Sequence, residues 1–369
     1  MRVKLKDIFD LQMGKTPSRS NLEYWNTTDY KWISIADLTK TSKYIFETKE
    51  YLSKSAIKDS GIKVIPANTV VMSFKLSIGK TAITKEDMYS NEAIMAFKDK
   101  HVINIIPEYI FYLFKYKNWE EGSNKAVMGK TLNKATLSEI EVEICSIEKQ
   151  RQIVNILDKI MSAVDGRKQE LQLLDELIKA RFVEMFGNPV TNEKGWKQRQ
   201  LGEITTKIGS GATPKGGKEA YQEEGITLIR SMNVHNGLFE YKELAHISEE
   251  QAEKLDNVTI EENDVLLNIT GASVARSCVV PSKILPARVN QHVCIIRCNQ
   301  CIVPEFLNKL LIDDNYQRLL WSIAEAGATR EAITKQQVES LQIIMPPIEL
   351  QEQFADFVHQ VDKSKVAVQ

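Results

Sequence analysis

One stretch decides the fold: Gln150–Phe186, which reads QRQIVNILDKIMSAVDGRKQELQLLDELIKARFVEMF. Apolar residues recur in it at alternating steps of four and three, along a stripe of Ile153, Leu157, Ile160, Val164, Leu171, Leu174, Ile178 and Met185. This spacing is the heptad signature of a helix that packs along another helix. Gly187 and Pro189 end the helix, because glycine suits a C-cap and proline cannot continue a helix. At 1.5 Å per residue the helix would be roughly 55 Å long.

The sequence on either side of this helix repeats itself. Residues 1–149 and 198–350 are distant copies whose matching blocks follow in the same order. Thr16-Pro17 returns as Thr213-Pro214, Asn91-Glu92 returns as Asn290-Gln291, and Pro107-Glu108-Tyr109 returns as Pro304-Glu305-Phe306. Chance explains one such block, but it does not explain a series in register.

Each copy predicts a small α+β domain followed by a helix. Short β-rich runs broken by Gly, Asn and Pro precede a short helix over 107–117 and again over 304–313. The second closing helix carries Phe354, Val358 and Val361 at the positions of Ile153, Leu157 and Ile160. The fold class is therefore α+β, with two tandem, similar domains related by a pseudo-twofold axis and long helices that pack as an antiparallel coiled coil.

The repeat also places the boundaries. We expect a first domain over 1–148, a central spacer helix over 149–190, a second domain over 191–346 and a short distal helix over 347–369. The alternative is one domain built around a long core helix, and the repeat favours the spacer. Because the distal helix is short, we expect part of the stripe between Leu171 and Met185 to be uncovered.

Composition is typical of a soluble protein with no membrane segment. Charged residues make up 26% and hydrophobic residues 43% of the 369 residues. No apolar run has the length of a membrane span, and the first residues lack a signal-peptide core. Five cysteines in a chain of this length indicate reduced thiols and a cytoplasmic location. The net charge of −1 means that any DNA-binding face must be a local patch.

Two segments next to the predicted helices resemble a known family. Residues 182–196, FVEMFGNPVTNEKGW, resemble the junction after the central conserved helix of specificity (S) subunits of type I restriction–modification systems. Pro346-Pro347-Ile348-Glu349-Leu350-Gln351 resembles the segment that opens the conserved helices of that family. Ser146–Gln150 is similar to the same segment with its prolines lost. The resemblance covers the whole chain, because the layout of repeat and helix matches as well.

This resemblance implies a non-catalytic DNA-recognition subunit. In such subunits each target-recognition domain reads one half of a split, asymmetric DNA sequence, and the paired helices set the distance between the halves. The helices also dock methyltransferase (M) subunits, of which we expect two, and restriction (R) subunits can join. No cofactor is expected on this chain, since S-adenosylmethionine and ATP would bind the partner subunits. The distal helix is shorter than the family's usual one.

Two other functions stay open at this stage: an adaptor whose coiled coil binds a partner without reading DNA, and an unrecognised nuclease or fused methyltransferase. Catalytic motifs are incomplete, since the chain has no Asn-Pro-Pro-Tyr box for adenine methylation. Gly79-Lys80-Thr81 and Gly129-Lys130-Thr131 imitate the end of a P-loop without its first glycine. Cys294, Cys298 and Cys301 form a candidate zinc set with Cys278 and His292, although the strand-like sequence between them favours buried thiols.

DNA contacts are predicted in loops that recur in both copies and present a cation beside small or polar residues. The loop pairs are Gly14–Arg19 with Ser210–Lys218, Lys75–Lys80 with Thr270–Arg276, Asn91-Glu92 with Asn290-Gln291, and Gly122–Thr131 with Gly327–Arg330. For any single cation the alternative is a solvated surface charge. The candidate DNA-binding residues are Lys15, Thr16, Arg19, Lys75, Lys80, Asn91, Lys130, Lys215, Lys218, Arg230, Arg276, Asn290 and Arg330. The candidates for helix pairing and subunit docking are Ile153, Leu157, Ile160, Val164, Leu171, Leu174, Ile178, Phe354, Val358 and Val361.

Overall fold

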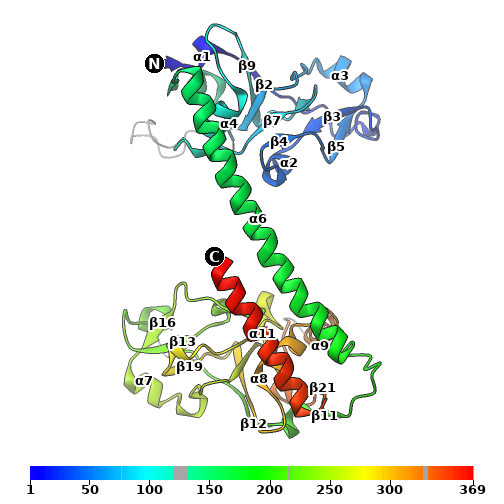
Figure 1. Ribbon diagram of the computed structural model, residues 1–369, viewed down its shortest axis with the longest axis vertical. Helices are drawn as coiled ribbons and strands as arrows, with labels where there is room; N and C mark the ends of the chain where they lie inside the picture. Colours follow the sequence, from blue (N-terminus) through cyan, green and yellow to red (C-terminus); the bar gives the residue numbers. More distant parts are fainter. Residues whose placement is uncertain (76, 120–131, 215–216, 327–330, 369) are drawn as a thin grey trace. The chain divides into compact units, whose positions relative to one another are not determined.

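The computed structural model describes residues 1–75, 77–119, 132–214, 217–326 and 331–368 (Figure 1). The chain divides into a first unit, Met1–Asp165, and a second unit, Gly166–Gln369. The boundary lies inside helix α6 (Ile147–Phe186), so each unit holds one globular domain and one part of this helix. Its 40 residues correspond to about 60 Å. The long helix predicted from the heptad pattern is confirmed, and it begins three residues earlier than Gln150.

A five-stranded sheet forms the centre of the first unit, in the order β2-β9-β6-β7-β4. A second sheet has the order β5-β3-β8, and β1 pairs with β10. The strands are β1 (Arg2–Lys4), β2 (Phe9–Met13), β3 (Tyr30–Ile33), β4 (Tyr44–Ile45), β5 (Glu50–Leu52), β6 (Val70–Ser73), β7 (Thr81–Thr84), β8 (Tyr89–Ser90), β9 (Ile94–Asp99) and β10 (Glu141–Glu143). The helices are α1 (Leu5–Ile8), α2 (Ile35–Lys40), α3 (Lys54–Ser60), α4 (Pro107–Tyr116) and α5 (Lys134–Ser138).

The core of the first unit lies between this sheet, α4 and the first part of α6. All four residues of β6 and of β7 are buried, which suits strands that are covered on both faces. Pro107 occupies the first turn of α4, where its missing N–H costs nothing. Phe114 from α4 meets Phe9 and Phe97 of the sheet edge-on, with ring centroids 6.4 and 4.7 Å apart.

The second unit repeats this plan with a four-stranded sheet, β12-β20-β17-β18, and a three-stranded sheet, β16-β13-β19. β11 pairs with β21, and β14 forms a hairpin with β15. The strands are β11 (Gln198–Gln200), β12 (Thr205–Ser210), β13 (Ile226–Ile229), β14 (Val234–His235), β15 (Leu238–Phe239), β16 (Ala245–Ile247), β17 (Val265–Asn268), β18 (Ser277–Val279), β19 (Ala287–Val289), β20 (Val293–Cys298) and β21 (Gln342–Ile344). The helices are α7 (Glu249–Glu253), α8 (Pro304–Leu311), α9 (Asp314–Glu325), α10 (Lys335–Glu339) and α11 (Ile348–Val368).

Strand pairing confirms the repeat that the sequence predicts. β3 pairs antiparallel with β5 and parallel with β8, and β13 makes the same pairings with β16 and β19. β9 lies between β2 and β6 as β20 lies between β12 and β17. Asn68 and Asn263, just before β6 and β17, both adopt a left-handed backbone with φ of 58° and 68°. Two tandem α+β domains of one topology are therefore present.

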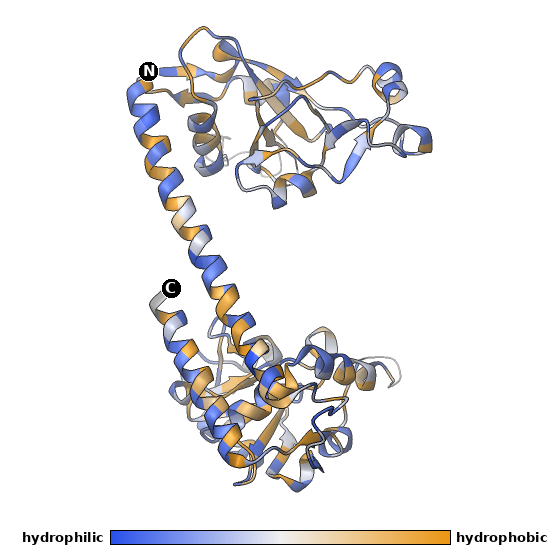
Figure 2. Cartoon of the chain, turned by 45° about the vertical axis from the view of Figure 1, so that its right-hand side comes forward, coloured by the Kyte–Doolittle hydropathy of each residue, from blue (hydrophilic) through white to orange (hydrophobic). Residues whose placement is uncertain are grey.

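In the second unit α11 packs antiparallel along the last turns of α6. The Phe354 ring lies 5.5 Å from Phe182 and 5.4 Å from Phe186, while Lys365 near the far end of α11 pairs with Asp175 at 2.6 Å. Figures 1 and 2 both show the two helices side by side here. The antiparallel helix pair is confirmed. The stripe between Leu171 and Met185 is covered over most of its length: Ile178 is buried in one core with Phe354, Val358 and Val361 of α11, and Leu174 and Met185 pack against the same core. Leu171, at the start of this stretch, is half-buried and is not part of that core.

The stripe in the first unit has a different partner from the one predicted. Ile153 and Leu157 pack against the core of their own domain and not along a second helix. Ile160 and Val164 are 52% and 40% exposed, and residues 162–170 are all exposed. Apolar residues nevertheless recur along the whole of α6 (Figure 2). A heptad stripe specifies which helix face is apolar, but it does not specify what covers that face.

Each long helix is attached to its domain by one buried glutamine, and the two glutamines occupy equivalent positions. The side chains of Gln150 and Gln351 are fully buried. In each, the amide oxygen accepts from one backbone N–H and the amide nitrogen donates to two carbonyls, so the buried group is satisfied. The partners of Gln150 are Ile106, Asn104 and Cys145, and those of Gln351 are Val303, Cys301 and Pro346. This pairing explains why both helix-opening segments carry a glutamine.

Within the described ranges, no helix combines the length and the apolarity that crossing a bilayer requires.

Candidate nucleic-acid interface

Three predicted loops of the first unit meet at one end of its main sheet, and we call their described residues loop cluster 1: residues 14–19, 75, 77–80 and 91–92. The amides of Gly14 and Lys15 donate to the carbonyls of Ile94 and Ser90, at 3.1 and 2.8 Å. The Thr16 hydroxyl donates to the Glu92 carboxylate and so joins two of the loops through side chains. The third loop is attached because the amide of Phe74 donates to Ala93 O at 3.0 Å.

The cations of loop cluster 1 differ in how strongly the protein holds them. Arg19 binds Glu50 through both terminal nitrogens and lies over the Trp25 ring, 3.7 Å from its centroid. Lys15 donates to the Ser60 carbonyl, and Lys80 donates to the Thr39 hydroxyl at 2.5 Å. Lys75 lies over Phe74 at 5.4 Å and makes no ion pair within the described ranges. Lys75 is therefore the most available of these cations.

Glu92 is an exposed carboxylate surrounded by these groups. The hydrogen bond from Thr16 is the main cause that lowers its pKa from the usual value, burial opposes this shift, and the charges of Lys75 and Arg19 add to the lowering. The Glu92 side chain is therefore ionised at neutral pH. It accepts hydrogen bonds and donates none.

The equivalent loops of the second unit also meet, and we call them loop cluster 2: residues 210–214, 270–276 and 290–292. The Thr213 hydroxyl donates to Gln291 Oε1 at 2.5 Å, which repeats the bond between Thr16 and Glu92. The imidazole of His292 joins the third loop, with Nδ1 2.5 Å from Thr270 Oγ1 and Nε2 3.0 Å from Gln291 Nε2. Three equivalent loops are thus brought together in each domain, and they carry different side chains in the two domains.

Two predicted cations of the second unit, Arg276 and Arg230, lie in and beside loop cluster 2. Arg276 Nη1 is 3.4 Å from His235 Nδ1, and the backbone of Arg276 pairs with Asn268 next to β17. Arg230 follows β13, donates to the Glu243 carbonyl and lies 5.5 Å from the Tyr221 ring centroid. Both guanidinium groups are half-buried, and both reach the surface from strand ends.

One glycine in each domain lets the first loop pass close to the sheet. A β-carbon at Gly14 would overlap the Asn91 carbonyl oxygen, and one at Gly211 would overlap the Val289 carbonyl oxygen. Any other residue would push the loop away from its neighbour. These two glycines therefore hold Thr16 and Thr213 within bonding distance of the residues after Asn91 and Asn290.

Asn91 and Asn290 have a structural part in these loops. Each side-chain oxygen accepts from the amide two residues later, at 3.0 Å, and Asn290 is buried. Such a turn positions the residue between, which is Glu92 in one domain and Gln291 in the other. The sequence repeat marked these dipeptides, but it did not show that the second residue, and not the asparagine, is exposed.

Four of the predicted DNA-binding residues cannot be placed. Lys130, Lys215 and Arg330 lie outside the described residues, as does the side chain of Lys218. The loops over 120–131 and 327–330 are outside the description as well.

The zinc alternative does not fit the geometry. Cys294 and Cys298 lie at the two ends of β20, which places them about 13 Å apart. Burial raises the pKa of each thiol to about 12, which suits the buried thiols that the sequence favoured. No cluster of three metal-binding side chains occurs among the described residues. Gly79-Lys80-Thr81 lies between β6 and β7, two antiparallel strands, and does not open a helix as a P-loop does.

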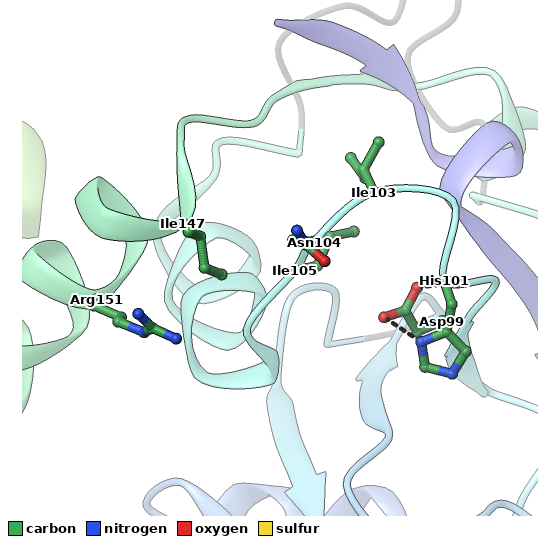
Figure 3. Close-up of a pocket in the computed structure, with 7 residues that line it drawn as sticks. All are labelled: Asp99, His101, Ile103, Asn104, Ile105, Ile147 and Arg151. Atoms are coloured by element: carbon green, nitrogen blue, oxygen red, sulfur yellow. Dashed lines mark hydrogen bonds and ion pairs between the residues drawn. The ribbon is translucent and has the colours of Figure 1, made fainter.

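A shallow hollow of about 370 Å³ lies at the opposite end of β9 from loop cluster 1 (Figure 3). His101 pairs there with Asp99 at 3.3 Å, and Arg151 borders it from α6. β9 itself spans about 17 Å, so this hollow is separate from the loops. It adds no charged or reactive group to loop cluster 1.

Sequence comparison relates both halves of the chain to one protein family. The sequence model of the type I restriction modification DNA specificity domain family matches residues 1–176 and again residues 193–369. The chain belongs to this family. The resemblance to type I specificity subunits that the sequence suggested is thereby confirmed. The first match includes one domain and most of α6, and the second includes the other domain and α11.

Two specificity subunits are related to this chain in sequence, one over nearly the whole chain and one over less than half of it. The MjaIX specificity subunit of a type I restriction enzyme from Methanocaldococcus jannaschii is 25% identical over 378 residues, which cover 96% of this chain and 85% of the relative. The EcoR124I/EcoR124II specificity subunit from Escherichia coli is 26% identical over 171 residues, 43% of this chain and 41% of the relative.

Solved structures share the fold. The crystal structure of a type I S subunit from M. genitalium has a TM-score of 0.58 at 14% identity, covering 100% of this chain and 90% of that one. A chain from a structural study of complex assembly in the type I restriction–modification system has a TM-score of 0.57 at 17% identity, covering 100% of this chain and 91% of that one.

Proposed function

We propose that this chain is the non-catalytic DNA-recognition subunit of a type I restriction–modification complex and that it reads a bipartite, asymmetric target. One observation carries the proposal: the same three loops meet in both domains, at the same end of the same sheet, but present different side chains. Equivalent positions suit two similar ligands, and a DNA duplex offers two segments of one backbone. Different side chains suit two different base sequences.

Lys75, Arg276 and the lysines around the loops would contact phosphates, while the polar side chains of the loops would contact base edges. Phosphate contacts fix the position of a protein on DNA, and base-edge contacts supply the sequence preference. Lys130, Lys215 and Arg330, which lie outside the described residues, stay candidates for these roles: Lys215 follows the loop over 210–214 in sequence, and Lys130 and Arg330 belong to the fourth predicted loop pair.

The long helix supplies the second part of the function. α6 exposes Ile156, Ile160, Leu173, Leu177 and Val183, all between 47% and 57% accessible. Ile156 and Ile160 are four residues apart and share one face of the helix, and Leu173 and Leu177 share another. Exposed apolar patches of this kind mark surfaces that bind other proteins. We propose that these residues dock M subunits, two per complex, and that R subunits join the assembly. S-adenosylmethionine and ATP would then bind those partners, and this chain would hold no cofactor.

The test is DNA binding by the chain co-purified with its M subunits, measured against salt concentration on a pool of random duplexes. A recognition subunit selects one split sequence and binds more weakly as salt rises, since phosphate contacts release counterions. Complete absence of DNA binding, with the M subunits still attached, would support a protein adaptor and reject the proposal. Methyl transfer by the chain alone would support an enzyme instead.

Docking is tested separately with Ile160→Glu, which places a charge on the exposed helix face that Ile160 shares with Ile156. The variant should lose M subunits in co-purification, while Glu170→Gln, on the same exposed stretch of helix, should retain them. Equal retention by both variants would place the docking surface elsewhere.

A further inference from the structure

Glu92 and Gln291 occupy the same place in loop clusters 1 and 2 but have different chemistry. Each follows the asparagine turn, precedes the second strand of its main sheet, β9 or β20, and is exposed. Each accepts a hydrogen bond from the equivalent threonine, Thr16 or Thr213. These side chains are therefore pre-positioned by rigid neighbours, which a sequence-reading group requires.

The unused hydrogen-bonding capacity of the two side chains differs. In Glu92, Thr16 occupies one position on Oε2, and every remaining site on the carboxylate is an acceptor. In Gln291, Thr213 occupies one lone pair of Oε1, and one N–H of the amide is directed at His292 Nε2. This leaves Gln291 with one N–H donor and one acceptor lone pair on the same planar group.

His292 keeps the Gln291 amide in this orientation. Its Nε2 accepts from Gln291, so its proton is on Nδ1, which donates to Thr270 Oγ1 at 2.5 Å. In loop cluster 1 the position of His292 is occupied by Ala93, which is buried and has no polar group to offer. The two side chains are thus held differently. Gln291 is held by the side chains of Thr213 and His292, and Glu92 by the Thr16 hydroxyl and two nearby cations.

The neighbouring cations are less suited to reading bases. Arg19 is committed to Glu50 and Trp25, Lys15 to the Ser60 carbonyl, and Lys80 to Thr39. Lys75 remains beside Glu92, and its positive charge offsets the repulsion between that carboxylate and a DNA backbone. A carboxylate in a cationic loop can therefore approach a base edge.

We propose that Glu92 and Gln291 are the base-reading residues that make the two half-sites different, an inference that rests on the proposed function. In the major groove a carboxylate accepts from cytosine N4, whereas a glutamine amide pairs with both N6 and N7 of adenine. The first domain then prefers a cytosine, and the second an adenine, at equivalent positions of their half-sites.

The test exchanges the two groups in the chain bound to its M subunits and selects duplexes from a random pool. Glu92→Gln should change one position of the first half-site from cytosine to adenine, and Gln291→Glu should make the reverse change in the second. Affinity for the original sequence should fall about 10- to 100-fold in each case, with the other half-site intact. Glu143→Gln is the matched control, because it removes one exposed carboxylate on β10, a strand that pairs with β1 outside the main sheet.

Each outcome has one meaning. Selection of the exchanged bases at one position per half-site supports the inference. Retention of the original bases by both variants, or an equal loss of affinity for all sequences, overturns the inference and leaves the proposed function standing. A wild-type complex that selects no sequence at all overturns the proposed function, and the inference falls with it.

Discussion

Phe186→Ala should destabilise the second unit strongly, because this ring joins both long helices to the domain. The Phe186 side chain is fully buried, with ring centroids 4.8 Å from Phe306 on α8, 5.2 Å from Phe182 on α6 and 5.4 Å from Phe354 on α11. Replacing a buried phenylalanine by alanine costs about 3–5 kcal/mol, counting both lost burial and the cavity left behind. Edge-on ring contacts contribute about 0.5–1.5 kcal/mol each to such clusters. We therefore expect a loss near the top of that range, about 4–5 kcal/mol.

Hydrogen exchange measured peptide by peptide separates the two units and so locates this loss. A change of about 4 kcal/mol should raise exchange of the most protected amides in α8 and α11 by about three orders of magnitude, and amides of β6 and β9 in the first unit should be unaffected. Phe46→Ala is the control, since the Phe46 side chain is 57% exposed and should change little. The reasoning is refuted if Phe186→Ala exchanges no faster than Phe46→Ala, because the four-ring cluster would then contribute nothing to the packing of α11.

Three further perturbations test other parts of the structure. Asp264→Asn should lower the free energy of unfolding of the second unit by about 2–3 kcal/mol, because buried donors that lose their acceptor are costly. The buried Asp264 carboxylate accepts two bonds from Arg297, at 2.8 and 2.9 Å, and one from the Glu261 amide at 2.7 Å, and an asparagine offers one acceptor oxygen fewer, while Arg297 keeps its ion pair with Glu261. Thermal melting beside the exposed Asp10→Asn checks it, and equal melting temperatures would contradict it. Burial raises the pKa of Asp158, but the hydrogen bonds from Lys43 and Tyr112 outweigh it and leave the pKa below the usual value. The folded-state pKa is depressed, so this carboxylate stabilises the first unit above its unfolded pKa of about 3.9, and the contribution is lost as pH falls through the folded value. Asp158→Asn should therefore make the free energy of unfolding of the first unit fall less steeply as the pH is lowered. Asp165→Asn, on the exposed part of α6, is the control. An identical dependence on pH in both variants would exclude this role for Asp158. Inserting four residues after Glu170 adds about one helical turn of 5.4 Å to α6, so the unread spacer should lengthen by about one to two base pairs at 3.4 Å each; methylated sites with the original spacer would show that helix length does not set the spacing.

The fold could be predicted from local patterns that survive in the sequence. The heptad stripe of α6 and the blocks shared by the two copies are both visible without a structure, since each depends on spacing along the chain. The partner of the stripe could not be predicted, because Ile153 and Leu157 meet their own domain while Ile178 meets α11. Burial of a periodic face depends on contacts between residues distant in sequence.

The candidate site was predicted at the level of loops and not of side chains. The repeat identified the loops that form both clusters, and the glycines in them have the close approaches that require glycine. It did not distinguish Asn290, which is buried in a turn, from Gln291, which is exposed beside it. Both are polar amides in a loop, and only the start of β20 decides which of them points outward. Arg19 was predicted to contact DNA from its place in a loop alone, and its ion pair with Glu50 and its contact with the Trp25 ring could not be predicted from the sequence.

The central claim, that each domain reads its own half of a split target, is tested most directly by exchanging one domain. Residues 1–148 would be replaced by the corresponding domain of another family member, and the hybrid expressed with its M subunits in cells whose methylated adenines are then mapped. We predict that one half of the methylated sequence changes to that of the donor, while the other half and the spacer stay as they were. A hybrid whose two half-sites both change, or whose methylated sequence is unaltered, would contradict the account.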